Sequence, residues 1–381
     1  MTGRERIKAA LTGAPVDRPP VLLGDSFILY ERELPDDEFF WYWMREKRFL
    51  DLREYVRPWC DCYCGFAPPL FNRYMMVSAN RVATERKQIS NDLRIVYGTI
   101  SLPSGDVHFE DHQKRGFVTD WYVKVPGNEV EALERIIAAP FEVDEKALRE
   151  SVRLYDELDA KLGDNGYINI FLPSPAVTIS NVMHLELFLE LCHTEPELMH
   201  GFCEEVTRRM TLCIDALFRE KKPDCAVMFG GCEQFTPPLM RPESFDEFVV
   251  PYEGKLVKQL KKYGNPLECH CHGKISYAIH KIMEMGYDAI NPIEPPPQGD
   301  LTYAEARAIA DDKITLVGNI EVVELELGTP EHMKRRIQEL LSLGKDRLMI
   351  VDAGAGLRQA LTERMDLNYR AWIDEYAAQC G

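Results

Sequence analysis

The sequence predicts an α/β chain of the (β/α)8 TIM-barrel class, with an N-terminal extension and a small β-rich insertion. The first observation behind this prediction is that short apolar segments alternate with amphipathic ones from residue 167 onward. Repeated β-then-α units of this length imply parallel strands joined by crossover helices. The second is that polar residues follow nearly every apolar segment, as they do at the carboxyl ends of barrel strands. A doubly wound sheet is the alternative, disfavoured because no glycine-rich phosphate loop follows the first strand.

The expected strands are short apolar segments bounded by turn residues. They cover residues 21–23, 167–172, 226–230, 267–271, 289–292, 314–317 and 348–351. Helical periodicity predicts helices over residues 4–12, 243–263, 274–285 and 330–343. Thr329 and Pro330 open the last of these as its cap and first-turn residue. Residues 92–125 are β-rich, and we expect a strand pair or a small sheet there.

The length of 381 residues suits one large enzyme-sized domain or two ordinary ones. We expect a single barrel domain over residues 1–381. Residues 25–130 would form an aromatic, acidic and β-rich insertion over the barrel mouth.

The charge balance and the cysteines restrict the class of protein. Lys and Arg number 45 against 62 Asp and Glu, which gives a formal net charge of −17. This excess of acid argues against a general nucleic-acid binder and against attachment to an anionic membrane surface. The eleven cysteines and an N-terminus without an apolar signal segment indicate free thiols in the cytoplasm. No run of apolar residues is long enough to span a membrane.

The run from Cys269 to His272, Cys-His-Cys-His, is the sharpest local signal. Side chains alternate along an extended segment, so His270 and His272 share one face. A His-x-His pair at a strand end is a common way to hold a divalent metal, and a catalytic zinc takes three protein ligands. Glu233 is the best third ligand and Asp352 a fourth candidate. In the alternative interpretation the histidines only form hydrogen bonds within the barrel mouth and the cysteines pack as small hydrophobes.

Three further residues at strand ends are candidates for substrate binding. Asp25 follows the first strand, although it could equally cap a turn. Glu294 precedes three prolines and is held rigidly, as a ligand-facing acid or as an ion-pair partner. Asn319, in Gly-Asn-Ile-Glu, could bind substrate or stabilise its own turn. Cys60, Cys62 and Cys64 lack the two-residue gap of zinc knuckles and are interpreted as ordinary thiols.

Several sequence blocks carry a family likeness. They are RERIKAALTGAPVDRPPV, PPLMRPESFDEFVVPY, the strand ending His-x-His-Gly, GYDAINPIEPP, LVGNIE and GTPEHMKRRI. In order and spacing they resemble the uroporphyrinogen decarboxylase superfamily, which also contains cobalamin-dependent methyltransferases. The resemblance covers nearly the whole chain and is strongest from Ala226 to Arg336.

Departures from the family pattern distinguish between its branches. The decarboxylases carry an arginine-rich N-terminal segment for substrate carboxylates, whereas this chain has the acidic, aromatic stretch LLGDSFILYERE. The methyltransferases use a His-x-Cys pair and a late Cys to bind zinc. Here His272 and Ala355 stand in the places of those two cysteines. The remaining ligands, Glu233, His270 and His272 with Asp352, would leave a more electrophilic zinc.

The resemblance therefore implies a corrinoid-linked methyltransferase of the demethylase type, with Glu233, His270 and His272 as its catalytic residues. It would move a methyl group between a small molecule and a corrinoid held by a partner protein, because no Asp-x-His-x-x-Gly motif for cobalamin occurs in this chain. One alternative is a decarboxylase of a small acid or a tetrapyrrole. Another is a non-catalytic barrel that binds a corrinoid or another ligand. Barrels of this family often form homodimers, which leaves that assembly open here.

Overall fold

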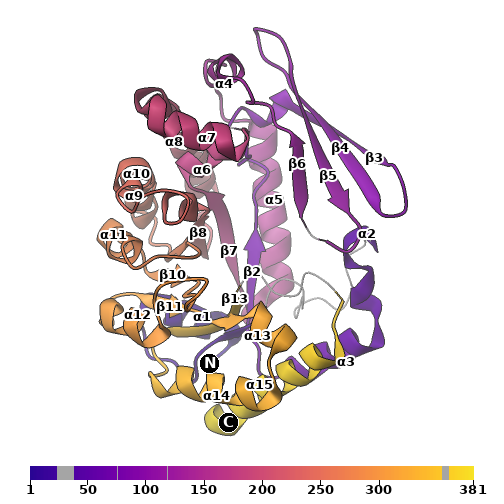
Figure 1. Cartoon of the computed structure of the whole chain (residues 1–381), viewed down its shortest axis with the longest axis vertical. Coiled ribbons are helices and arrows are strands. Elements are labelled where there is room, and N and C mark those ends of the chain that lie inside the picture. The colour runs from indigo at the N-terminus through magenta and orange to yellow at the C-terminus, as the bar shows by residue number, and fades with distance from the viewer. Residues whose placement is uncertain (24–37, 75, 118, 354–359) are drawn as a thin grey trace. The chain divides into compact units, whose positions relative to one another are not determined.

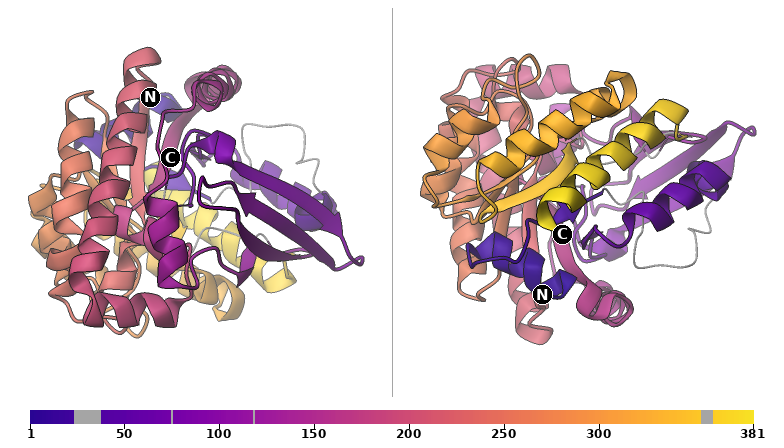
Figure 2. Two further views of the ribbon diagram at one scale, coloured as in Figure 1. Left: turned by 90° about the horizontal axis from the view of Figure 1, so that it is seen from above. Right: turned by 90° about the horizontal axis from the view of Figure 1, so that it is seen from below.

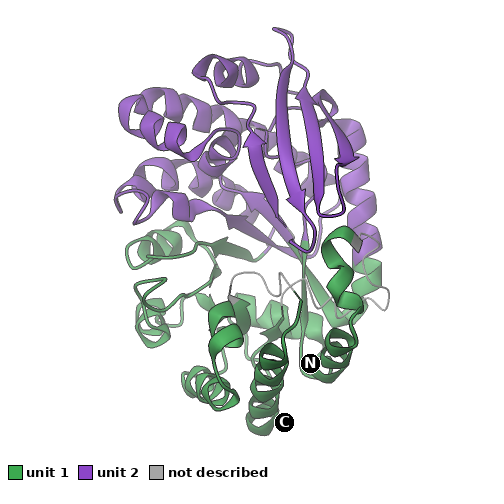
Figure 3. Cartoon of the chain, turned by 45° about the vertical axis from the view of Figure 1, so that its right-hand side comes forward, with its two compact units in different colours: residues 1–65, 159–169, 266–381 green, residues 66–158, 170–265 purple. Residues whose placement is uncertain are grey.

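The computed structural model describes residues 1–23, 38–74, 76–117, 119–353 and 360–381 (Figure 1). Asp25 and Ala355 lie outside these residues. The chain divides into two compact units, which Figure 3 shows in different colours. Unit 1 comprises residues 1–65, 159–169 and 266–381, and unit 2 comprises residues 66–158 and 170–265.

Eight parallel strands form a nearly closed barrel, which confirms the predicted fold class. Their order in the sheet is β1-β13-β11-β10-β9-β8-β7-β2, and the short β12 pairs with β13. The bounds are β1 Val21–Leu22, β2 Cys62–Phe66, β7 Gly166–Pro173, β8 Cys225–Gly230, β9 Leu267–His270, β10 Ala289–Asn291, β11 Thr315–Val317, β12 Ile320–Glu321 and β13 Leu348–Ala353.

Seven of the eight strands lie within a few residues of their predicted positions, and β2 is the one that the sequence did not predict. Its sequence, CYCGF, is short and contains a glycine, so it lacks the β-branched run that marks a buried strand. Asp61, the residue before β2, forms a hydrogen bond to β1: its backbone N–H donates to the carbonyl of Val21 at 2.8 Å. Two of the three cysteines interpreted as ordinary thiols, Cys62 and Cys64, therefore belong to a barrel strand.

Unit 1 carries the helices near both chain ends. They are α1 Gly3–Thr12, α2 Glu38–Trp41, η2 Tyr42–Arg45, α3 Lys47–Val56, η4 Gly163–Asn165, α11 Ala278–Met285, α12 Tyr303–Ala310, α13 Val322–Leu327, α14 Pro330–Ser342 and α15 Glu363–Cys380. Thr2 and Glu5 form a capping box at the start of α1. Thr329 Oγ1 accepts from the backbone N–H of His332 at 3.2 Å, so α14 begins at the predicted cap. Helices α14 and α15 lie side by side (Figure 2).

Unit 2 contains the β-rich insertion as a four-stranded antiparallel sheet in the order β3-β4-β5-β6. Its strands are β3 Val82–Gln88, β4 Leu93–Ile100, β5 Val107–Lys114 and β6 Asp120–Lys124. Its helices are η3 Ala79–Arg81, α4 Val130–Ile137, α6 Pro175–Ser180, α7 Leu185–Thr194, α8 Pro196–Glu220, η5 Cys232–Phe235, α9 Ser244–Phe248 and α10 Val250–Lys261, while α5 Glu145–Leu162 ends in unit 1.

The helix expected over residues 243–263 is divided into α9 and α10 at Val249. Pro251 explains the division, because a proline has no N–H to donate to the preceding turn and is tolerated only in the first turn of a helix. Among the described helices, none combines the length and the apolar character that crossing a lipid bilayer requires.

Candidate functional site

The predicted site residues are distributed over both units. His270, His272, Glu294, Asn319 and Asp352 belong to unit 1, and Glu233 belongs to unit 2. Within unit 1, His270 is the last residue of β9, and its register partner on β10 is Asn291. Unit 1 therefore brings the two histidines and Glu294 to the carboxyl ends of neighbouring strands.

The imidazole rings of His270 and His272 are neighbours. Their centroids are 4.6 Å apart and their planes are nearly perpendicular, at 82°. Burial, helped by the adjacent His272, lowers the pKa of His270 to about 4. The His270 ring is therefore neutral at pH 7, which is the protonation state that a metal ligand requires.

Each of the two imidazoles has an oxygen acceptor at Nδ1. His270 Nδ1 lies 3.1 Å from Asn291 Oδ1, and His272 Nδ1 lies 2.9 Å from Glu294 Oε1. A carboxylate can only accept, so His272 Nδ1 donates, and the lone pair of the neutral ring is then on Nε2. Metal-binding histidines are commonly oriented in this way by a carboxylate or an amide behind them.

Glu294 is itself held by two donors. Its Oε2 accepts from the backbone N–H of Gly273 at 2.6 Å, while its Oε1 accepts from His272. Burial opposes ionisation of this carboxyl, but the hydrogen bonds from His272 and Gly273 outweigh it and lower its pKa. Glu294 therefore orients His272 as an ionised carboxylate.

Glu233 lies in η5, directly after β8. Gly231 before it adopts a left-handed φ of 95°, and a Cβ there would approach Val177 Cγ1 to 2.5 Å, so a glycine is required at this turn. The Sγ of the buried Cys232 and a carboxylate oxygen of Glu233 lie within 4.8 Å of one another. Unit 2 thus offers a thiol and a carboxylate at one strand end, although the sequence pointed to the carboxylate alone.

Unit 1 by itself does not complete a three-ligand metal site. No three potential ligand atoms of its described residues lie within 4.8 Å of one another. The two imidazoles fit a divalent metal in donor type and orientation, and they need at least one more ligand.

The comparisons with known proteins bear on the family. A family model described as uroporphyrinogen decarboxylase (URO-D) matches residues 108–364. The chain belongs to the uroporphyrinogen decarboxylase family. The predicted resemblance is confirmed at this level.

One solved structure, a methyltransferase, supports the fold of this family member. A methyltransferase from Methanosarcina mazei is 15% identical, and the similarity covers 100% of both chains with a TM-score of 0.62. An enolase protein from the environmental genome shotgun sequencing of the Sargasso Sea is 11% identical over 72% of this chain and 85% of that chain, with a TM-score of 0.20. No curated protein matches the sequence.

Asn319 was predicted to bind substrate, but both ends of its side-chain amide form hydrogen bonds within the protein. Its Nδ2 donates to the carbonyl of Ile293, and its Oδ1 accepts from Arg336 Nη2 at 2.9 Å. The residue is fully buried. These bonds fasten the segment after β11 to the segment that carries Glu294, and the role of Asn319 in substrate binding stays a prediction.

Asp352 lies on β13, and its Oδ2 accepts from the hydroxyl of Tyr369 on α15 at 3.0 Å. Both side chains are buried. Its described partner is therefore a tyrosine of a surrounding helix, and its role as a metal ligand also stays a prediction.

Sequence reasoning did not single out Glu268, a fully buried acid two residues before His270 on β9. By strand alternation the two side chains share a face. The hydroxyl of Tyr63 on β2 donates to Glu268 Oε2 at 2.7 Å. Burial raises the pKa of Glu268 to about 7, although hydrogen bonds from Tyr63 and Asn291 oppose the rise. Glu268 could have been identified from the sequence, because an acidic residue within the buried strand segment LECH needs a partner or a function.

Glu321 was likewise not singled out, although it ends the Gly-Asn-Ile-Glu motif. It is 8% exposed, its side chain caps α13, and its Oε1 has no hydrogen-bond partner among the described residues. Burial, and after it the neighbouring carboxylates of Glu294 and Glu324, raise the pKa of Glu321 to about 7. This acid therefore belongs to the electrostatic surroundings of His272 and Glu294.

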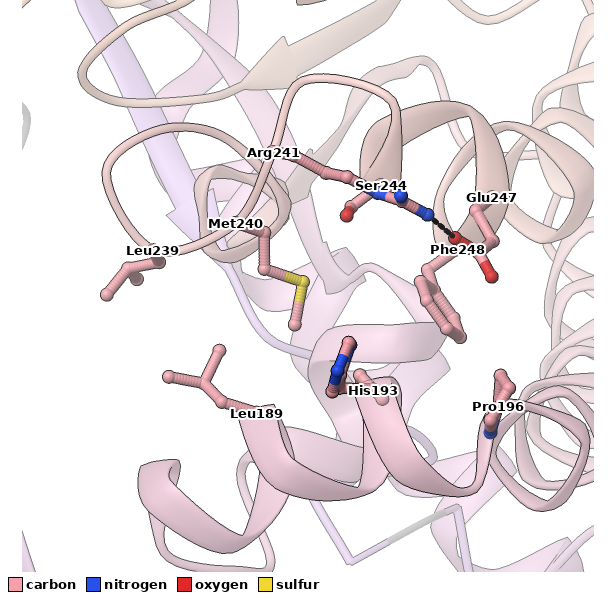
Figure 4. Close-up of a pocket in the computed structure, with 10 residues that line it drawn as sticks. Leu189, His193, Pro196, Leu239, Met240, Arg241, Ser244, Glu247 and Phe248 are labelled. Atoms are coloured by element: carbon pink, nitrogen blue, oxygen red, sulfur yellow. Dashed lines mark hydrogen bonds and ion pairs between the residues drawn. The ribbon is translucent and has the colours of Figure 1, made fainter.

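A cavity of about 530 Å³ lies within unit 2, between α7, α9 and the segment before α9 (Figure 4). Leu189, Met240 and Phe248 form part of its apolar lining, and Arg241 pairs with Glu247 at 3.3 Å in its wall. None of the predicted site residues lines it.

Proposed function

We propose that this chain is a corrinoid-linked methyltransferase of the demethylase type. It moves a methyl group between a small molecule and a corrinoid protein, and a metal at the barrel mouth assists. The observation that carries the proposal is the His270–His272 pair, in which each Nδ1 has an oxygen acceptor. The fold, shared with a methyltransferase along the whole of both chains, supports it.

His270, His272 and Glu233 would hold the metal, with Asp352 as a further candidate ligand. Zinc is the expected ion, since imidazole and carboxylate suit it. When bound, it would act as a Lewis acid that lowers the basicity of the leaving oxygen or sulfur. Glu294 and Asn291 keep the two imidazoles in the tautomer whose Nε2 can bind a metal.

The corrinoid would come from a separate protein, because the chain lacks the Asp-x-His-x-x-Gly motif. The substrate would be a small methyl donor or acceptor, with Asp25, Glu294 and Asn319 as candidates for contacting it. A decarboxylase of a small acid or tetrapyrrole is the competing function. The described surroundings of His272 count against a polycarboxylate substrate, because Glu294 and Glu321 are acidic and Arg336 already pairs with Glu324 at 3.1 Å.

Metal analysis combined with two histidine variants tests the proposal. Protein purified without chelators should contain stoichiometric zinc, and His270→Ala and His272→Ala should lose it. Methyl transfer from a methoxylated substrate to cob(I)alamin, followed by the cobalamin absorption spectrum, should be lost with the metal. His280→Ala is the matched control, because His280 is an exposed histidine on α11. Protein without stoichiometric metal whose activity survives His270→Ala would refute the proposal.

A further inference from the structure

Glu268 is a fully buried acid to which the proposed function gives no role. The hydroxyl of Tyr63 on β2 donates to its Oε2 at 2.7 Å. Strands β2 and β9 are not neighbours in the sheet, so this hydrogen bond crosses the barrel interior and does not run along the sheet. Burying a carboxyl group costs free energy that an apolar side chain of similar size would not cost. Packing alone therefore does not account for an acid at this position.

The strand register places Glu268 beside the amide that contacts His270. Between β9 and β10, Glu268 is paired with Ala289, and His270 is paired with Asn291. Residues two apart in a strand share a face, so the side chains of Glu268, His270 and Asn291 lie on the same face of the sheet. The hydrogen bond from Tyr63 shows that this face is the interior one. Asn291 also donates a hydrogen bond to the Glu268 carboxylate.

The amide of Asn291 could face the imidazole of His270 in either of two orientations. In the observed one, Oδ1 of Asn291 lies 3.1 Å from Nδ1 of His270, so this nitrogen must donate. In the reversed one, the amide nitrogen would donate to Nδ1, and the proton of the neutral ring would then be on Nε2. The tautomer of His270 therefore follows from the orientation of one amide.

Glu268 distinguishes the two amide orientations. A carboxylate accepts hydrogen bonds and donates none, so it stabilises the orientation in which the amide nitrogen of Asn291 points toward it. Oδ1 is then left to face His270, as observed. The reversed amide would bring its oxygen against the carboxylate inside the barrel, where an unpaired polar group is costly. Tyr63 holds the Glu268 carboxyl in place from the other side of the interior.

We infer that Glu268 is a positioning residue, which sets the tautomer of His270 through the amide of Asn291. The series of hydrogen bonds runs from Tyr63 through Glu268 and Asn291 to His270. All four residues belong to unit 1. The series leaves the lone pair of the His270 ring on Nε2. The tautomer does not depend on which reaction the chain performs, whereas the use of Nε2 to bind a metal rests on the proposed function.

NMR spectra of protein carrying isotope-labelled histidine test the inference, because the two tautomers of a neutral imidazole give different ring-nitrogen signals. The metal-free full chain is measured at about pH 8.5, roughly two units above the ordinary pKa of imidazole. His270→Ala identifies the signals of His270 among those of the nine histidines. The wild type should show the Nδ1–H tautomer alone. Glu268→Gln should shift the ratio of the two tautomers by about tenfold or more toward Nε2–H, the factor expected when a hydrogen bond to a charged group is lost.

Exchanging the two side-chain groups provides a rescue. In the double variant Glu268→Gln/Asn291→Asp, the new amide can donate to the new carboxylate, which accepts from His270 Nδ1. This variant should regain the single Nδ1–H tautomer, which a mere loss of packing would not produce. It also carries the test if Glu268→Gln alone does not fold, because it keeps one carboxylate and one amide. Two tautomers in the folded double variant would overturn the inference.

Glu253→Gln is the matched control, because Glu253 is also a fully buried acid but lies on α10 in unit 2. It should leave the tautomer of His270 unchanged, and the melting temperature of each variant shows whether it folds. A single Nδ1–H tautomer in folded Glu268→Gln would overturn the inference, and so would a mixture of tautomers in the wild type.

Zinc binding is measured separately, so that the two proposals can fail independently. Glu268→Gln should weaken zinc binding by about 10- to 100-fold, as the loss of an orienting partner behind a metal ligand does. A chain that binds no zinc but shows the tautomer shift would refute the metal in the proposed function and support the role of Glu268.

Discussion

Glu294 is the residue whose contacts most directly specify the orientation of an imidazole. Its Oε1 accepts a hydrogen bond from His272 and its Oε2 accepts one from the backbone N–H of Gly273. Both carboxylate oxygens are therefore held in place. Removing such an orienting group typically lowers metal affinity by about 10- to 100-fold. The effect comes from the lost orientation of His272, since Glu294 itself is not among the proposed metal ligands.

Glu294→Ala should therefore weaken zinc binding by roughly 10- to 100-fold. Competition with a chromophoric chelator measures the dissociation constant directly. Glu284→Ala, which removes an exposed glutamate of α11, is the control and should bind zinc like the wild type. An unchanged affinity in Glu294→Ala would show that His272 needs no such support.

Glu321 predicts a dependence of stability on pH. Its pKa is about 7 in the folded chain against an ordinary value of 4.5, so the folded chain holds this proton more tightly than the unfolded chain. The free energy of unfolding should therefore fall as pH rises from about 4.5 to about 7. The contribution of this one group is at most roughly 3 kcal/mol.

Glu321→Gln removes the titrating group but keeps an oxygen to cap α13. Urea unfolding at several pH values should show a flatter pH profile for this variant than for the wild type. Glu331→Gln, at an exposed position on α14, should leave the profile unchanged. Parallel profiles for wild type and Glu321→Gln would contradict the prediction.

At the level of elements, Arg336 on α14 anchors the segment between β11 and β12. Its Nη2 donates to the carbonyl of Asn319 at 3.1 Å and to Asn319 Oδ1 at 2.9 Å. Its Nε pairs with Glu324 on α13 at 3.1 Å. The Arg336 guanidinium thus connects α13 and α14 to Asn319, which in turn donates to the carbonyl of Ile293.

Arg336→Ala should lower the free energy of unfolding by about 2–3 kcal/mol, because buried acceptors on Asn319 lose their donor. Arg336→Lys should recover only part of the loss, since an ammonium cannot reproduce the planar fork. Chemical denaturation measures both variants, and Arg335→Ala at an exposed neighbouring position is the control. A full recovery by lysine would show that charge alone matters here.

At the level of unit 1, Asp61 connects segments that are far apart in the sequence. The buried carboxylate pairs with Arg6 on α1 and with Arg18, whose Nη1 is 2.9 Å from Asp61 Oδ2. Arg18 also donates to the hydroxyl of Tyr376 on α15 at 3.0 Å. The first and last helices of the chain are therefore tied to the entrance of β2.

Asp61→Ala should lower the free energy of unfolding by roughly 3–5 kcal/mol, because it leaves two guanidinium groups without their buried counter-charge. Thermal and urea unfolding measure the loss. Asp51→Ala, which breaks an exposed pair with Lys47, should cost less than about 1 kcal/mol. Equal losses in the two variants would show that burial does not set the strength of the Asp61 pairs.

The sequence by itself determined the barrel class, seven of its strands and the cap of α14, because periodicity and capping are local properties of neighbouring residues. It also placed His270 and His272 on one face. Only the tertiary structure decided that CYCGF is a barrel strand, that the amide of Asn319 is used by Ile293 and Arg336, and that Glu321 stands beside Glu294. The physical reason is that strand pairing, burial and electrostatic coupling depend on contacts between residues that are distant in the chain, which no local pattern records.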